Sequence, residues 1–234
     1  MSTKTLVLAG LMTALVIVFQ YLASSMPGIF GPFNTAIGLV PIAIGAILCG
    51  PIVGGWLGLV FGAVVLLSGG ANLFFAFNIP GTIITVLLKG AACGFAAGLV
   101  NKLLSRFNKI VAVFAAAIVC PVVNTGVFLL GSAIFFMPYA EEIATEAKIE
   151  GAGFAVFIAM AFANFLFELG MNTVLSPVMV TIINVAEKTF KKNKKQNKAE
   201  PAKASEESKV EEPSHEAEPE ALSESEPSDS VNEE

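Results

Sequence analysis

Charged side chains are almost absent from the first four fifths of this chain. The first 186 of its 234 residues carry six basic and five acidic residues, whereas the last 48 carry eight lysines and fourteen acids. A soluble domain of this size needs many more polar groups to cover its surface. The body has a formal charge of only +1 (six minus five) and no basic stripe, which argues against nucleic-acid binding. We therefore expect an all-α, polytopic membrane protein embedded in the lipid bilayer.

Six apolar runs are candidates for membrane-spanning helices, each of which needs about 20 mainly apolar residues. Pro41 and Pro121 fall inside such runs and are expected to kink their helices, which bundles tolerate. Gly- and Pro-rich segments at Met26–Asn34 and Gly69–Asn78, and the segment Met137–Ala152, are expected to be loops. The sequence thus predicts a bundle of six transmembrane helices, at Thr5–Ser24, Thr35–Cys49, Ile52–Ser68, Gly81–Val100, Ile110–Phe136 and Gly153–Val185.

The distribution of basic residues predicts the orientation of these six spans. Basic residues favour cytoplasmic loops. They occur at Lys4, in the loop from Lys102 to Lys109, and directly after the last span, whereas the three other loops carry four glutamates and one lysine. Both termini are therefore expected to be cytoplasmic.

The composition changes near residue 188 to Lys, Glu, Ser, Ala and Pro. Such a segment cannot bury enough apolar surface to fold alone. We expect two parts: a six-helix membrane domain at residues 1–187 and a disordered, charged cytoplasmic tail at residues 188–234.

Residue types that carry catalysis or bind metals are scarce in the body. The one histidine, His215, lies in the tail, and Cys49, Cys93 and Cys120 have no metal-type spacing. No phosphate-binding G-x-x-x-x-G-K-[ST] loop occurs. The sequence predicts no catalytic residues, no metal and no cofactor, and an enzyme is the least favoured class.

Small residues recur every fourth position in three of the expected helices. They are Gly50, Gly54, Gly58 and Gly62; Gly90, Gly94 and Gly98; and, more loosely, Ala9 with Thr13 and Gly10 with Ala14. Residues four apart share a helix face, where another backbone can approach closely. Such stripes serve packing within the chain or, alternatively, contact with a second protein.

Polar side chains inside the expected spans are the best candidates for a binding site. Lys89 and Glu168 lie too far from the ends of their helices to reach an interface easily, and a charge near the bilayer centre costs about 2.5–3.5 kcal/mol or more. Asn164, Glu168 and Asn172 form a stripe four residues apart, and Asn124 with Thr125 adds a second polar spot. These groups either bond one another as structural contacts or surround a small polar ligand.

The chain resembles the membrane-embedded substrate-binding (S) components of energy-coupling factor (ECF) vitamin transporters over roughly Thr3–Lys188. The resemblance rests on the six short spans, on L-A-G-L-M-T-A-L in the first, on Ile37–Gly62 and on V-V-N-T-G-V-F at Val122–Phe128. It implies a subunit of the bacterial cytoplasmic membrane that captures a vitamin at the outer face, between the fourth to sixth spans and the loop after the first. It also implies two kinds of partner, a transmembrane coupling (T) subunit and two cytoplasmic ATPase subunits. The T subunit would meet the first helix at a pattern matched loosely by Ala9, Gly10, Thr13 and Ala14.

Carried onto this chain, the resemblance suggests the substrate-binding residues Lys89, Asn124, Asn164, Glu168 and Asn172, with loop residues Asn34, Asn72 and Asn78 behind them. A buried cation with several amides suits pantothenate, a monocarboxylate with hydroxyl and amide groups. Two alternatives stay open: a standalone secondary transporter or facilitator for a small polar metabolite, and a scaffold without ligand in which Lys89 and Glu168 pair.

Overall fold

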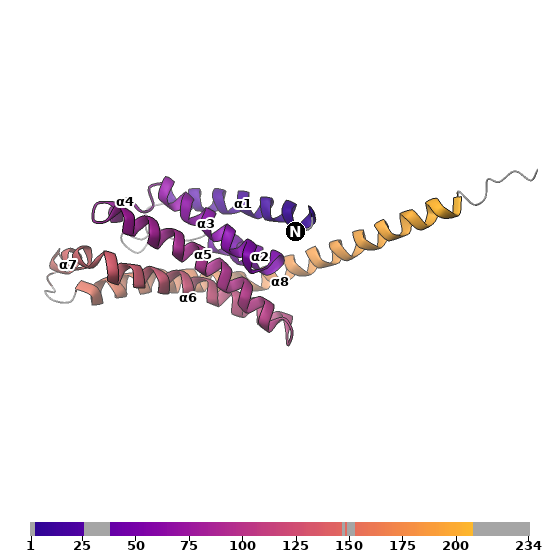
Figure 1. Cartoon of the computed structure of the whole chain (residues 1–234). Coiled ribbons are helices and arrows are strands. Elements are labelled where there is room, and N and C mark those ends of the chain that lie inside the picture. Colours follow the sequence, from indigo (N-terminus) through magenta and orange to yellow (C-terminus); the bar gives the residue numbers. More distant parts are fainter. Residues whose placement is uncertain (1–2, 26–37, 147, 149–152, 208–234) are drawn as a thin grey trace, which may run out of the picture. The chain divides into compact units, whose positions relative to one another are not determined.

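A computed structural model describes residues 3–25, 38–146, 148 and 153–207 of the chain (Figure 1). Within these residues the structure has eight helices and no strand, which confirms the all-α prediction. The helices are α1 (Thr3–Ser24), α2 (Leu39–Cys49), α3 (Pro51–Leu67), α4 (Asn72–Phe75), α5 (Ile79–Leu104), α6 (Lys109–Phe135), α7 (Met137–Glu146) and α8 (Gly153–Glu207).

Four segments of the described chain are long and apolar enough to cross a membrane. They are α1, α5, α6 and Ala161–Val185 within α8. The other two expected spans are also apolar helices, but α2 has 11 residues and α3 has 17. At about 1.5 Å per residue, α2 reaches roughly half of a 30 Å hydrocarbon core. That the chain crosses the membrane six times therefore stays a prediction. Residues 35–37, the first of the expected second span, lie outside the described residues.

Two segments expected to be loops contain helices. Most of Met137–Ala152 forms α7, and Gly69–Asn78 contains the single-turn α4. In α7 the alanines Ala140 and Ala144 are both buried, and their spacing of four places them on one face. Two small apolar residues at helical spacing thus give a buried helix face to a segment that was expected to be a loop.

The chain divides into two units, Met1–Glu187 and Lys188–Glu234. The first contains α1 to α7 and the apolar part of α8. In the second, α8 is described as far as Glu207, and residues 208–234 lie outside the described residues. Disorder of the tail stays a prediction.

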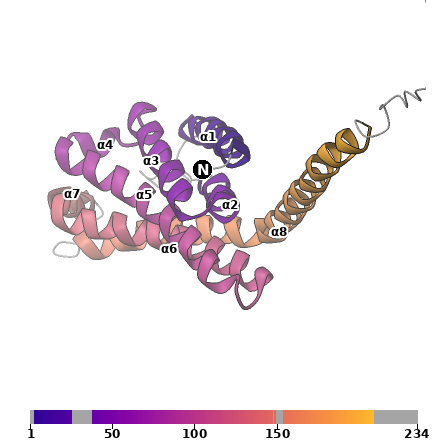
Figure 2. The ribbon, with the colours of Figure 1, turned by 45° about the vertical axis from the view of Figure 1, so that its right-hand side comes forward.

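The glycine stripes of α3 and α5 face each other within the first unit, where the two helices lie side by side (Figure 2). A Cβ atom built on Gly54 would lie 2.9 Å from the carbonyl carbon of Gly94 and would collide with its oxygen. A Cβ on Gly58 would collide in the same way with the carbonyl of Gly90. The two backbones are therefore in direct contact, which only glycine permits here.

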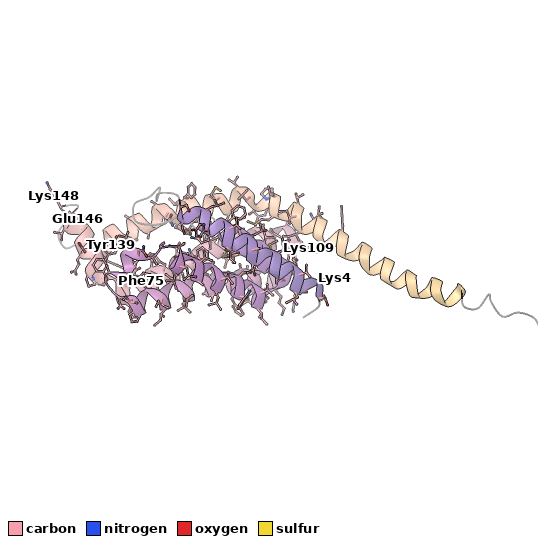
Figure 3. The ribbon with its side chains drawn as sticks, turned by 90° about the horizontal axis from the view of Figure 1, so that it is seen from above. Lys4, Phe75, Lys109, Tyr139, Glu146 and Lys148 are labelled. Atoms are coloured by element: carbon pink, nitrogen blue, oxygen red, sulfur yellow. The ribbon has the colours of Figure 1, made fainter. Side chains whose placement is uncertain are left out.

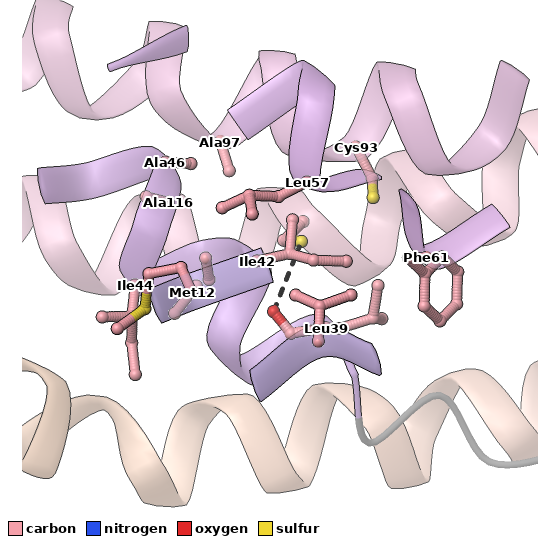
Figure 4. Packing of buried hydrophobic residues seen from close by; sticks show 14 of the residues in the cluster. Met12, Leu39, Ile42, Ile44, Ala46, Leu57, Phe61, Cys93, Ala97 and Ala116 are labelled. Atoms are coloured by element: carbon pink, nitrogen blue, oxygen red, sulfur yellow. Dashed lines mark hydrogen bonds between the residues drawn. The ribbon is translucent and has the colours of Figure 1, made fainter. Parts of the chain in front are cut away.

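The short helix α2 lies in the centre of the apolar core (Figure 4). Leu39, Ile42 and Ala46 are at most 1% exposed and pack among residues of α1, α3, α5 and α6. A helix that is apolar on all sides is typical of a buried position. Cys93 and Cys120 are part of the same cluster, where they serve as small apolar side chains.

The labelled residues of Figure 3 mark the two ends of the first unit. Lys4 and Lys109 lie at one end, and Tyr139, Glu146 and Lys148 lie at the other, together with α4 and α7 (Figure 3). Lys4 and Lys109, two of the basic residues expected to be cytoplasmic, thus lie at the same end of the first unit. The assignment of that end to the cytoplasm stays a prediction.

Candidate functional site

A cavity of about 50 Å³ lies inside the first unit, between α1, α3, α5, α6 and α8. Phe61, Phe74, Phe128 and Phe136 form much of its apolar wall. Its polar wall comes from four helices and consists of Gln20, Thr82, Thr85, Lys89, Asn124, Thr125, Asn164 and Glu168. The cavity therefore collects polar groups that are otherwise rare in this apolar chain.

Lys89 reaches the cavity from α5, together with Thr82 and Thr85. The spacing of three and four residues puts the three side chains on one face of the helix. The ammonium nitrogen of Lys89 lies 5.0 Å from the ring centroid of Phe128, a distance typical of a cation–π contact. It also interacts electrostatically with Glu168. The aromatic face and the one carboxylate that the described cavity wall contains thus offset part of the cost of burying this cation.

Glu168 is only 3% exposed, and two amides donate to its carboxylate. Asn164, one turn earlier on α8, donates from Nδ2 to Oε1 at 2.9 Å. Asn124 donates across from α6, from Nδ2 to Oε2 at 3.4 Å. These bonds compensate part of the cost of burying the charge and link α6 to α8.

Several polar atoms of the cavity residues have no hydrogen-bond partner among the described residues. They are Oδ1 of Asn124, Oδ1 of Asn164, Oε1 of Gln20 and Oγ1 of Thr85. All four residues are at most 9% exposed. A buried polar atom left without a partner costs about 1–3 kcal/mol. Their concentration around one cavity is typical of a site that binds a polar molecule.

The other asparagines suggested by the sequence lie elsewhere. Asn78 caps the start of α5, since its side-chain oxygen accepts from the backbone N–H of Gly81 at 2.8 Å. Asn172 is 1% exposed and has no partner for either amide atom within the described part of the chain, but it does not line the cavity. Asn72 lies in α4 beside Gly69, and Asn34 lies outside the described residues. The cavity thus brings together Lys89, Asn124, Asn164 and Glu168 of the predicted set.

Sequence reasoning missed Gln20, Thr82 and Thr85. Gln20 is the one amide side chain in the first apolar run, and it is 1% exposed at the cavity wall. Its Nε2 donates to Oγ of Ser24 at 3.3 Å. An isolated glutamine in an apolar helix is as costly as an asparagine, so this signal was available in the sequence.

An aromatic cluster covers the end of the cavity at which α4, α6 and α7 meet. The Phe74 ring centroid lies 5.0 Å from that of Phe136 and 5.5 Å from those of Phe128 and Tyr139. Tyr139 also lies 4.7 Å from Phe77. Burial, and then the nearby charges of Glu142 and Glu146, raise the pKa of the Tyr139 hydroxyl, which keeps it neutral. Because Phe74, Phe128 and Phe136 also line the cavity, this cluster is part of its wall.

The small residues of α1 lie on two different faces. Gly10 and Ala14 are exposed, and a Cβ atom on Gly10 would meet nothing within 4 Å. Ala9 is buried, and the Thr13 hydroxyl donates to the Ala9 carbonyl oxygen at 2.8 Å. Of the residues suggested for partner docking, only Gly10 and Ala14 therefore form an open, small-residue surface, flanked by the exposed Leu11.

Comparison with protein families yields one finding. The sequence model of a family described as ECF transporter, substrate-specific component, matches residues 4–180 of the chain. No curated protein and no solved structure matches the chain. The matched range includes every residue that lines the cavity.

Proposed function

Since the chain belongs to the family of ECF transporter substrate-specific components, we propose that its cavity captures a small polar vitamin or related micronutrient, with pantothenate as the best candidate. Members of this family are transporter subunits and not enzymes, and they work in the membrane with T and ATPase subunits. In this proposal, capture occurs at the outer face, and the chain delivers its cargo inward with one T subunit and two cytoplasmic ATPases.

One observation carries the proposal: polar side chains from four helices converge on a single cavity, and several of their atoms have no partner among the described residues. Lys89 is suited to a ligand carboxylate, because charge-assisted hydrogen bonds are about twice as strong as neutral ones. The amide oxygens of Asn124 and Asn164 are suited to hydroxyl and amide donors. Pantothenate carries one carboxylate, one amide and two hydroxyl groups, and so matches both needs.

The size of the cavity sets a condition on capture. A volume of about 50 Å³ holds on the order of one or two water-sized groups, whereas pockets for vitamin-sized ligands measure about 300–1,000 Å³. Binding must therefore widen the cavity. The aromatic cluster around Phe74 is the part of the wall contributed by the short helix α4 and by the C-terminal part of α6 with Phe136, its C-cap.

The ATP-driven part of transport belongs to partner subunits, because the sequence contains no phosphate-binding loop. We assign docking of the T subunit to the exposed α1 face with Gly10 and Ala14. Its small residues let another helix approach closely in the membrane. Ala9 and Thr13, which lie on or toward the inner side of α1, support the bundle instead.

Native mass spectrometry of the purified chain, followed by calorimetry with common B vitamins and their precursors, tests the proposal. We expect a co-purified ligand and 1:1 binding. Replacing Asn164 by Leu should weaken that binding, whereas Asn101→Leu, the same change at the far end of α5, should not. Folded protein that binds none of these compounds would contradict the proposal. Sustained uptake by vesicles that contain this chain alone would instead favour a standalone transporter.

A further inference from the structure

The carboxylate of Glu168 determines which end of two neighbouring amides faces the cavity. An ionised carboxylate only accepts hydrogen bonds, so an asparagine bonded to it must present its NH₂ group. Asn164 and Asn124 both do so, at 2.9 Å and 3.4 Å. The Oδ1 atom of each amide is thereby turned away from Glu168. Both oxygens are buried in the cavity wall with no donor among the described residues.

A third amide oxygen adds to this set from a different helix, α1. Gln20 in α1 uses its Nε2 to donate to Ser24, whose Oγ also receives the hydroxyl of Ser68 at 2.7 Å. Its Oε1 has no donor among the described residues. The hydroxyl of Thr82 is already used, since it donates to the carbonyl oxygen of Asn78 at 2.7 Å. The wall therefore offers three amide acceptors from α1, α6 and α8, against the donors of Lys89 and Thr85.

We propose, as an extension of the proposed function, that the ligand is recognised at the Asn124–Asn164 end through at least two N–H or O–H donors of its own. The ligand class is a small polar molecule with such donors on one edge, as in a cyclic urea, a lactam with a hydroxyl group, a primary amide, or the hydroxyl and amide groups of pantothenate. Glu168 is a positioning residue in this arrangement: it holds the amides with their oxygens toward the ligand. A ligand carboxylate is excluded from that end and lies toward Lys89.

Two small probes of equal ring size test this polarity. In 2-imidazolidinone two N–H groups flank a carbonyl, and in ethylene carbonate two ring oxygens replace them. Each is titrated by ligand-observed NMR into the full chain in lipid nanodiscs. Ethylene carbonate has acceptor oxygens where the urea has N–H donors, so it loses two hydrogen bonds to the amide oxygens. It should therefore bind at least about tenfold more weakly than 2-imidazolidinone. Equal affinity for the two probes, or no binding of the urea at millimolar concentrations, would overturn the proposal.

The variant Glu168→Gln separates positioning from a merely structural role. Glutamine is close in volume but can donate, so the two asparagines are free to turn, and the affinity ratio of the two probes should fall toward one. A structural role would lower both affinities and leave the ratio unchanged, which would refute the positioning role. Asn101→Leu, remote from the cavity, serves as the control. If Glu168→Gln does not fold, Asn164→Leu tests the amide acceptors directly: loss of one acceptor should lower the ratio, and an unchanged ratio would overturn the proposal.

Calorimetry with vitamins on the same preparations distinguishes this inference from the proposed function. Vitamin binding without selectivity between the two probes would overturn the inference and leave the proposed function intact. Selectivity between the probes without binding of any vitamin or precursor would support the inference and contradict the proposed function.

Discussion

Adjacent glycines on α3 should respond oppositely to the same substitution. Gly54 faces α5, where a new Cβ would lie 2.7 Å from the Cβ of Ala46 and 2.9 Å from the carbonyl carbon of Gly94, and would collide with the Gly94 oxygen. Gly55, the next residue, has Cβ of Phe95 at 3.6 Å as its nearest neighbour, an ordinary contact. We therefore compare Gly54→Ala with Gly55→Ala.

The expected cost of Gly54→Ala follows from the atoms that it meets. Two of them belong to the α5 backbone, so no side-chain rotation relieves the collision, and α3 must move away from α5. Overpacking of a tight core costs about 1–3 kcal/mol and occasionally more, while alanine regains at most about 1 kcal/mol of helix propensity. Because backbone atoms are involved, we expect an overpacking cost near 3 kcal/mol. After subtraction of the helix-propensity gain, the unfolding free energy should fall by about 2 kcal/mol. Gly55→Ala should be neutral or slightly stabilising.

Cys93 and Cys120 provide the assay, because both are 0% exposed and become accessible to a thiol-reactive dye only when the bundle opens. Cys49 is half-buried and contributes a background that is the same in both variants. For a chain of this size 1 kcal/mol corresponds to about 2–4 °C in Tm, so Gly54→Ala should lower the transition by about 4–8 °C. Equal transitions for the two variants would refute the direct backbone contact between α3 and α5.

Three other predictions concern the cavity, the α1 face and the cap of α5. Lys89→Met should weaken a monocarboxylate ligand about 10- to 100-fold in calorimetry, the worth of one charge-assisted bond; an unchanged Kd would remove Lys89 from the site. Gly10→Leu should preserve ligand affinity and abolish uptake once the chain is reconstituted with its T and ATPase subunits, and normal uptake would rule out the Gly10–Ala14 docking face. Asn78→Ala should lower the unfolding free energy by about 0.5–2 kcal/mol through loss of the N-cap and change ligand affinity less than about twofold. A large loss of affinity with unchanged stability would show that Asn78 contacts the ligand.

The helical, membrane-embedded character of the chain could be predicted from the sequence, because it follows from composition alone. The glycine stripes of α3 and α5 could also be recognised as faces open to close approach, since residues four apart share one face of a helix, although the sequence left open whether the neighbour lies in the same chain. The pairing of the two stripes could not, because the spacing says which face is small but not which helix lies opposite. Helix α7 was missed, although the spacing of Ala140 and Ala144, which lie on its buried face, is visible in the sequence.

For the cavity, burial cost was a good guide to which residues converge. Lys89 and Glu168 are too expensive to face lipid, and Asn124 and Asn164 lie at the same wall. The same argument fails for Asn172, which is buried but does not line the cavity. Asn78 shows a second limit of predicting site residues from polar residue types. An asparagine before Ile-Pro at the start of a helix is a typical N-cap, and its side chain is then used for the helix rather than for a ligand. The orientation of the Asn124 and Asn164 amides around Glu168 depends on contacts between α6 and α8. Residue spacing within one helix cannot predict such contacts between two helices.

The antiparallel contact of α3 with α5 has a further consequence for the register of these helices. Gly98 faces Gly50 and Pro51, Gly94 faces Gly54, and Gly90 faces Gly58. Sliding α5 by one turn would instead set Gly98 against Gly54, Gly94 against Gly58 and Gly90 against Gly62. The displaced pairing contains as many glycines as the native one, and it would carry Lys89 about 6 Å along the bundle axis.

The two pairings differ at the last contact between the helices, the one made by Gly62 in the native arrangement. In the native one Gly62 accommodates the backbone of Val86 and Leu87, whereas after the slide Leu66 would have to fit there. Gly62 therefore fixes the register between α3 and α5. Through that register it also sets the depth of the Lys89 side chain in the bilayer.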